Sequence, residues 1–190
     1  MRNKRAVFVC GSGGSGKSTF VKNNLSEFVH IDVDIIYEEL LIDNGLGLKI
    51  KNFTNSEFKT STKLFEQSKL LNEEKFRNAV NDGKDIVIDG IGRNVDVIML
   101  QRSILERAGY FTYMIMLYSD LETCINRVES RDRVYSSEIT KDSWYESYSN
   151  LTEYKKQFGN RFLFIYTDAL DWKSKFQIFI TESTHNKVII

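Results

Sequence analysis

The sequence predicts an α/β fold in which helices cover both faces of a five-stranded, mostly parallel sheet. Short apolar segments alternate with longer helical ones along the 190 residues, which is typical of βαβ units. The apolar segments are nearly continuous, as expected for strands that are buried on both faces. The expected strands are residues 6–10, 28–32, 85–89, 110–117 and 161–166, and the expected helices are residues 17–25, 35–42, 56–81, 95–108, 121–130, 143–158 and 172–180.

Length and charge favour one globular domain that spans residues 1–190, with a lid at about residues 127–142 and a weakly defined tail at residues 181–190. Lys plus Arg number 26 and Asp plus Glu number 26, so the formal net charge is zero. A protein that coats duplex DNA usually carries a basic surplus, although a local basic groove is compatible with a balanced total. The two cysteines, Cys10 and Cys124, are expected to be reduced and buried.

The sequence carries no pattern of a signal peptide and no apolar run long enough to cross a bilayer. We therefore expect a cytoplasmic protein that does not use a membrane. No protein partner is predicted.

Residues 11–18, GSGGSGKS, match the phosphate-loop pattern G-x-x-x-x-G-K-[ST] in full. The motif follows an expected strand and opens an expected helix, so a flexible Gly/Ser turn with a chance lysine is the weaker interpretation. Its backbone amides can bind phosphates, Lys17 can reach the β- and γ-phosphates, and the Ser18 hydroxyl can ligate Mg²⁺. This predicts a three-layer α/β/α phosphate-loop kinase fold with ATP and Mg²⁺ as cofactors. The predicted ATP-binding residues of the loop are Gly11, Ser12, Gly13, Gly14, Ser15, Gly16, Lys17, Ser18 and Thr19.

Two aspartates, Asp32 and Asp34, follow the second expected strand. A hydroxyl that accepts a phosphoryl group needs a carboxylate to orient it and take its proton, and the carboxyl ends of parallel strands are where ligands bind. One of the two carboxylates could instead cap the following helix, expected near Ile35, and both can hold, with one aspartate as the cap and the other as the base. We favour Asp34 as the catalytic base and place both carboxylates at the acceptor.

The third strand ends at Asp89, in the segment IVIDGIGRN. Asp89 could belong to the magnesium shell, contact the acceptor, or be a solvated strand-end carboxylate. Arg93, four residues later, is a candidate for binding an acceptor phosphate or a solvated surface residue.

Residues 126–133, NRVESRDR, contain three arginines that could form a lid. Arg127 and Arg131 are four residues apart on one helix face, and Arg133 follows. Arginines that close over a transferred phosphoryl group stabilise its charge, so all three are predicted to bind ATP, and Arg127 and Arg131 with Lys17 are predicted to be catalytic. The alternative is an ordinary charged helix end with a Glu129–Arg133 pair.

The segments GSGGSGKST, HIDVDIIYE, IVIDGIGRN and NRVESRDR, in this order, resemble the phosphate-loop kinases grouped as zeta toxins and the phage polynucleotide 5′-kinases, over about residues 5–170. The resemblance implies that Asp34 deprotonates the acceptor and that Arg127 and Arg131 are lid arginines. Asp89 stands where zeta toxins usually carry Glu. Residues 143–158 are similar to the C-terminal helix of small zeta-like phage proteins, which suggests a phage or prophage origin.

One feature of the polynucleotide kinases is missing, because Ile35, Ile36 and Tyr37 stand where those enzymes carry a phosphate-binding arginine. The identity of the acceptor therefore stays open. The loop, Asp34 and the arginine lid together predict an ATP-dependent kinase that phosphorylates a hydroxyl of a small nucleotide-like acceptor or of a nucleic-acid end. A nucleoside monophosphate kinase and a nucleotide-binding switch or ATPase module without a kinase acceptor remain alternatives. A GTPase is not supported, because no N-K-x-D follows a strand.

Overall fold

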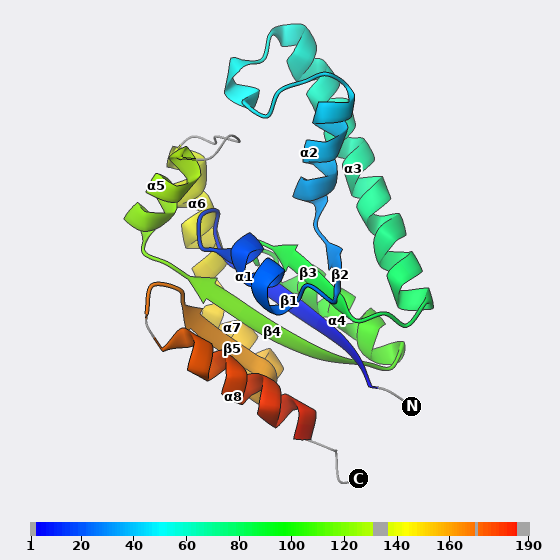
Figure 1. The fold of residues 1–190 in the computed structure, drawn as a ribbon, viewed down its shortest axis with the longest axis vertical. Helices are drawn as coiled ribbons and strands as arrows, with labels where there is room; N and C mark the ends of the chain where they lie inside the picture. Colours follow the sequence, from blue (N-terminus) through cyan, green and yellow to red (C-terminus); the bar gives the residue numbers. More distant parts are fainter. Residues whose placement is uncertain (1–2, 131–136, 170, 186–190) are drawn as a thin grey trace.

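The computed structural model describes residues 3–130, 137–169 and 171–185. Its sheet has five strands in the order β2-β3-β1-β4-β5, and all neighbouring pairs are parallel, which confirms the predicted fold class (Figure 1). The expected mostly parallel sheet is thus wholly parallel in the described residues. The strands are β1 (Lys4–Cys10), β2 (Val29–Ile31), β3 (Ile86–Gly90), β4 (Tyr110–Tyr118) and β5 (Phe162–Tyr166).

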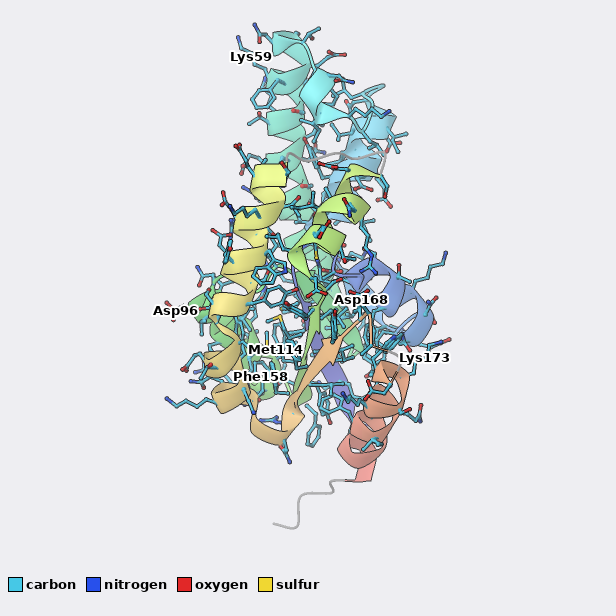
Figure 2. All side chains as sticks on the ribbon, turned by 90° about the vertical axis from the view of Figure 1, so that its left-hand side faces the viewer. Lys59, Asp96, Met114, Phe158, Asp168 and Lys173 are labelled. Carbon is cyan, nitrogen blue, oxygen red and sulfur yellow. The ribbon has the colours of Figure 1, made fainter. Side chains whose placement is uncertain are left out.

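Helices cover both faces of this sheet, so the domain has three layers. On one face lie α4 (Val95–Arg107), α7 (Leu151–Phe158) and the C-terminal part of α3 (Asn55–Asn81). The opposite face is covered by α1 (Lys17–Asn24) and α8 (Trp172–His185). Figure 2 shows Met114 and Phe158 inside the first of these interfaces. Burial on both faces explains why the strands are apolar without alternation.

The helices α2 (Val33–Asp43) and α3 form a hairpin that projects beyond the sheet (Figure 1). A short 3₁₀ helix, η1 (Ile50–Asn52), lies in their connection. The hairpin has a small apolar core of its own around Tyr37, Leu41 and Leu64. It therefore reaches away from the main core while Asp34 stays at its base.

The predicted helix at residues 143–158 is wrong in two respects, because the structure has two helices there and the first begins at Ser137. α6 (Ser137–Ser149) and α7 are separated at Asn150, and a 3₁₀ turn, η2 (Gly159–Arg161), precedes β5. The Asn150 side chain donates hydrogen bonds to the carbonyls of Gly92 (3.3 Å) and Arg93 (2.8 Å). These bonds tie the break to the loop after β3, a long-range contact that helical periodicity cannot predict.

Two further boundaries differ from expectation. Helix α2 begins at Val33 rather than near Ile35, and α8 continues to His185, so residues 181–185 of the expected tail are helical. Arg131 and Arg133 lie outside the described residues, as does the middle of the predicted lid. The described part of the lid is the end of α5 (Leu121–Glu129), Ser130 and the start of α6. Among the helices of the described residues, none has the length and apolar character that a membrane span requires.

Candidate functional site

The phosphate loop joins β1 to α1 and passes directly beneath α5. Gly14 has φ 79°, and a Cβ atom there would lie 2.4 Å from the Cys124 carbonyl oxygen. Gly16, at φ 94°, is the residue before α1. Both positions need glycine, because a side chain would combine a left-handed backbone with, at Gly14, an impossible contact. The glycines thus allow the loop to present its amides at the N-terminus of α1, where anions bind.

Lys17 is held within this loop. Its Nζ donates hydrogen bonds to the carbonyl oxygens of Gly11 (2.8 Å) and Ser12 (3.0 Å). Ser18 is exposed in the first turn of α1. The predicted phosphate-binding residues therefore lie together at one end of the sheet, at the carboxyl end of β1.

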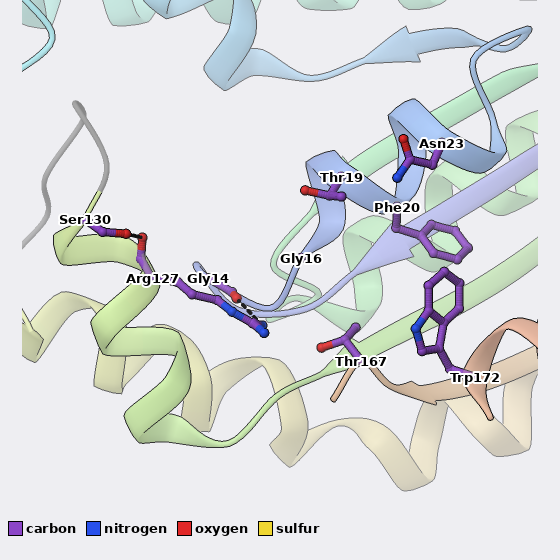
Figure 3. Close-up of a pocket in the computed structure, with 9 residues that line it drawn as sticks. All are labelled: Gly14, Gly16, Thr19, Phe20, Asn23, Arg127, Ser130, Thr167 and Trp172. Atoms are coloured by element: carbon purple, nitrogen blue, oxygen red, sulfur yellow. Dashed lines mark hydrogen bonds between the residues drawn. The ribbon is translucent and has the colours of Figure 1, made fainter. Parts of the chain in front are cut away.

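A cavity of about 430 Å³ opens on one side of the loop (Figure 3). The ring of Phe20 lies 5.8 Å from that of Trp172, centroid to centroid, and forms an apolar wall. Arg127 and Thr19 supply polar groups. The cavity is lined by Gly14, Gly16, Thr19, Phe20, Asn23, Arg127, Ser130, Thr167 and Trp172. An apolar wall next to a phosphate loop suits the base and sugar of a nucleotide.

Arg127 is fixed at this cavity by a network from three elements. Its guanidinium donates to the Gly14 carbonyl (3.3 Å), to Ser119 Oγ (3.2 Å) and to Asp168 Oδ1 (2.6 Å). Ser119 Oγ also donates to Asp168. Burial acts to raise the pKa of Asp168, but the bonds from Ser119 and Arg127 outweigh it and hold that pKa below its ordinary value. The ionised carboxylate thus keeps the arginine beside the phosphate loop.

A second cavity, of about 490 Å³, lies between the loop, the start of α2 and the end of β3. It shares no lining residue with the first cavity. Five of the predicted site residues line it together, namely Lys17, Asp32, Asp34, Asp89 and Arg93. The structure therefore brings the candidate acceptor residues to the phosphate loop, as the ends of β2 and β3 predict.

Asp32 and Asp34 differ in their surroundings. Asp32 is the N-cap of α2, because its Oδ1 accepts a hydrogen bond from the Asp34 backbone N–H at 2.8 Å. Burial first, and then the charge of Asp89, raises the pKa of Asp32 to about 6. Asp34 is exposed in the first turn of the helix. The sequence left open which of the two aspartates caps the helix, and the structure shows that Asp32 does.

His30, in β2, lies between two of these carboxylates. Its Nε2 is 3.7 Å from Asp32 Oδ2 and 3.6 Å from Asp89 Oδ2. The Asp89 side chain is only 6% exposed, and its Oδ2 has no hydrogen-bond partner among the described residues. A buried carboxylate oxygen that accepts no hydrogen bond, beside a phosphate loop, fits a magnesium shell, because Mg²⁺ prefers oxygen ligands. The side chains of His30, Asp32 and Asp89 offer ligand atoms that all lie within 4.8 Å of one another, so this group could hold a metal ion. That Ser18 shares the ion with Asp89 stays a prediction from the sequence.

Arg93 lies at the rim of the second cavity. Its side chain is 65% exposed and lies 3.5 Å from the carboxylate of Glu146 in α6. Its charge is thus partly offset by a neighbour that sequence spacing does not reveal.

The sequence of residues 7–153 matches the model of the AAA domain family. The chain belongs to the AAA domain family. No curated protein matches it in sequence.

Several solved structures share the fold of this AAA-family chain. A candidate kinase from Chloroflexus aurantiacus superposes with a TM-score of 0.64 at 13% identity, over 97% of this chain and 99% of that protein. The AvrRxo1-ORF1:-ORF2 complex solved with ATP superposes with a TM-score of 0.66 at 14% identity, over 90% of this chain and 56% of the matched chain of that complex. The PezAT toxin–antitoxin system of Streptococcus pneumoniae gives 0.59 at 16% identity, over 87% and 70%. At these identities the likeness shows a shared fold alone.

Several site residues of this AAA-family chain escape sequence analysis. Asp168 follows β5 and meets Arg127 across 41 positions, so no local spacing signals the pair. Trp172 has no motif around it and reads as the start of a helix. Asn72 lies in the middle of α3, where an amide usually faces solvent, yet it lines the second cavity.

Proposed function

We propose that the protein is an ATP-dependent kinase that transfers the γ-phosphoryl group to a hydroxyl of a small acceptor, with Asp34 as the base. The observation that carries this proposal is the second cavity, which joins Lys17 of the phosphate loop to Asp32, Asp34 and Asp89. A module that only binds or hydrolyses a nucleotide has no need of a second cavity with carboxylates at the loop. The acceptor expected from the sequence is nucleotide-like or a nucleic-acid end.

In the proposed reaction the triphosphate lies on the loop amides and Lys17, and its base occupies the cavity between Phe20 and Trp172. Asp34 accepts the proton of the acceptor hydroxyl, whose oxygen forms a bond to the γ-phosphorus as the bond to ADP breaks. Asp32 keeps Asp34 in place by capping α2. Arg127 stabilises the phosphates from the α5 side. Mg²⁺, held by Ser18 and Asp89, would neutralise phosphate charge.

A nucleoside monophosphate kinase is the second candidate, because it shares this fold. Its acceptor phosphate would need cations at the second cavity. The cationic side chains among the described lining residues are those of Lys17 and Arg93. Lys17 is proposed to bind the triphosphate, and Arg93 lies near Glu146. This supports a hydroxyl acceptor over a phosphate acceptor.

The test is a labelled-phosphate transfer screen with Mg-ATP against nucleosides, nucleotides, sugars, sugar nucleotides and oligonucleotides. Lys17→Ala serves as the inactive control. Asp34→Asn should lower turnover of the active acceptor by at least about 100-fold, the contribution of a general base. Its affinity for ATP should stay the same, because Asp34 does not line the cavity between Phe20 and Trp172 that is proposed to hold the base.

Asp43→Asn is the matched control, since Asp43 is an exposed acid at the far end of the same helix. Unchanged turnover in Asp34→Asn would remove Asp34 from the role of base. Transfer to no acceptor, with ATP still hydrolysed, would favour the switch or ATPase alternative and end the kinase proposal.

A further inference from the structure

We infer that the acceptor is an unphosphorylated polyhydroxyl compound of nucleoside or sugar type, rather than its phosphate ester. This inference rests on the proposed kinase function and concerns the same cavity. Three features of the cavity carry it: the sign of its charges, a buried oxygen that lacks a donor, and its apolar wall.

The charged side chains of the cavity are predominantly acidic. Three carboxylates, those of Asp32, Asp34 and Asp89, meet two cations, Lys17 and Arg93. Lys17 is bound into the phosphate loop, and Arg93 is largely exposed beside Glu146. With Asp89 assigned to Mg²⁺ and Lys17 to the triphosphate, an acceptor phosphate would still lie beside Asp32 and Asp34 and next to the triphosphate, and these like charges repel.

The environment of Asp32 agrees with this charge balance. The carboxylates of Asp32 and Asp89 lie 3.7 and 3.6 Å from the same atom, His30 Nε2, so two acidic groups already lie close together here. A phosphate group, with up to two negative charges, would meet the same field. A neutral hydroxyl compound would not.

Asn72 supplies the second feature. It lies on α3 and lines the cavity, and its Oδ1 is buried without a hydrogen-bond partner among the described residues. A buried acceptor oxygen that stays unpaired destabilises the structure, so a donor is expected to fill the position. Hydroxyl and amino groups of a ligand can donate to this oxygen, whereas an ionised phosphate group only accepts, so the part of the acceptor next to Asn72 is not a phosphate.

The third feature is the apolar wall formed by Phe65, Val97 and Ile98. Together with the amide of Gln101, it suits a compact ring that carries hydroxyl groups. A strand of nucleic acid, by contrast, would need cations for its flanking phosphates. Among the described residues that line the cavity, Arg93 is the only cation outside the phosphate loop.

The test uses three matched pairs: adenosine and AMP, uridine and UMP, and N-acetylglucosamine and its 1-phosphate. Labelled transfer from Mg-ATP gives kcat/KM for each compound, and calorimetry in the presence of a non-hydrolysable ATP analogue gives its affinity. In at least one pair we expect the unphosphorylated member to be favoured about tenfold or more in both measurements, since a site that rejects a group by charge and missing donors discriminates at least this strongly. Equal values, a preference for the phosphorylated members, or binding of none would overturn the inference.

The two measurements separate this inference from the proposed function. Binding that favours the unphosphorylated members without any transfer would support the cavity's preference and contradict the kinase function. Transfer that favours the phosphorylated members would support the kinase and contradict the preference.

Asn72→Leu tests the buried oxygen directly. Its affinity for the favoured compound should fall about tenfold, while its affinity for the ATP analogue stays unchanged. Asn78→Leu is the matched control, because Asn78 is an exposed amide on the same helix. An unchanged affinity in Asn72→Leu would show that no ligand donor reaches this oxygen.

Discussion

At Gly14 the phosphate loop lies so close to α5 that a side chain has no room. Its φ of 79° is also unfavourable for any other residue. We therefore expect Gly14→Ala to lower the free energy of unfolding by about 1–3 kcal/mol and to weaken ATP binding, because the loop must move away from Cys124. Urea denaturation and calorimetric titration with ATP measure the two effects.

Gly13→Ala is the control for this change. A Cβ atom at Gly13 would meet its nearest neighbour, Val128 Cγ2, at an ordinary 3.5 Å. Its unfolding free energy should stay near that of the unmodified protein. If Gly14→Ala bound ATP equally well, the close approach of loop and helix would have no part in forming the site.

Asp32 gives stability a dependence on pH. Its pKa is raised from the usual 3.8 to about 6. A raised acid pKa adds stability below pH 4 that is lost as the pH rises through about 6. Compared with Asp32→Asn, which keeps a capping oxygen, the unmodified protein should therefore gain stability as the pH falls from 7 to 4. Urea denaturation in EDTA at several pH values measures this, and a constant difference would contradict it.

The place of the phosphate loop between β1 and α1 could be predicted because one continuous segment carries the whole motif. Which of Asp32 and Asp34 caps α2 could not be predicted, since both follow the same strand. Only the folded backbone shows that the Asp34 N–H donates its hydrogen bond to the Asp32 carboxylate. Asp168 was missed for a different reason: its partner Arg127 is distant in sequence, and one carboxylate after a strand carries no pattern.

At the scale of elements, the turn after β5 holds α5 against the loop through Asp168. Asp168→Asn removes the charge that anchors Arg127, so we expect KM for ATP to rise about tenfold. Asp171→Asn, an exposed acid that pairs with Lys175 in the same turn, is the control and should leave KM unchanged. Steady-state kinetics with the acceptor from the screen measure both. An equal rise in both variants would point to a general disturbance of the turn.

The strands were predicted well because burial on both faces leaves an unmistakable apolar run, as in β4. Helix ends depend on single side chains and were predicted less well. Helix α2 starts early because Asp32 caps it, and the break at Asn150 follows from bonds to a loop 57 and 58 residues away. Such contacts exist only once the chain has folded.

At the scale of the whole molecule, the two cavities differ in whether the α2–α3 hairpin lines them. The first is lined by the loop, α1, the end of α5, the turn after β5 and the start of α8, whereas the second includes Asp34 on α2 and Phe65 on α3. The hairpin of α2 and α3 has its own small core, and Leu41 is completely buried in it. Figure 2 shows how far its outer end, near Lys59, lies from Lys173 on α8.

This separation predicts that the hairpin can loosen without loss of ATP binding. Leu41→Ala should destabilise the hairpin by about 2–5 kcal/mol, a large loss for a core with only three fully buried residues among the described ones. Hydrogen exchange should then accelerate in α2 and in the outer half of α3 but not in β1 or β4, and ATP affinity should stay unchanged while acceptor binding weakens. Leu70→Ala, at an exposed position of α3, is the control. Faster exchange throughout the sheet would show instead that hairpin and sheet unfold as one unit.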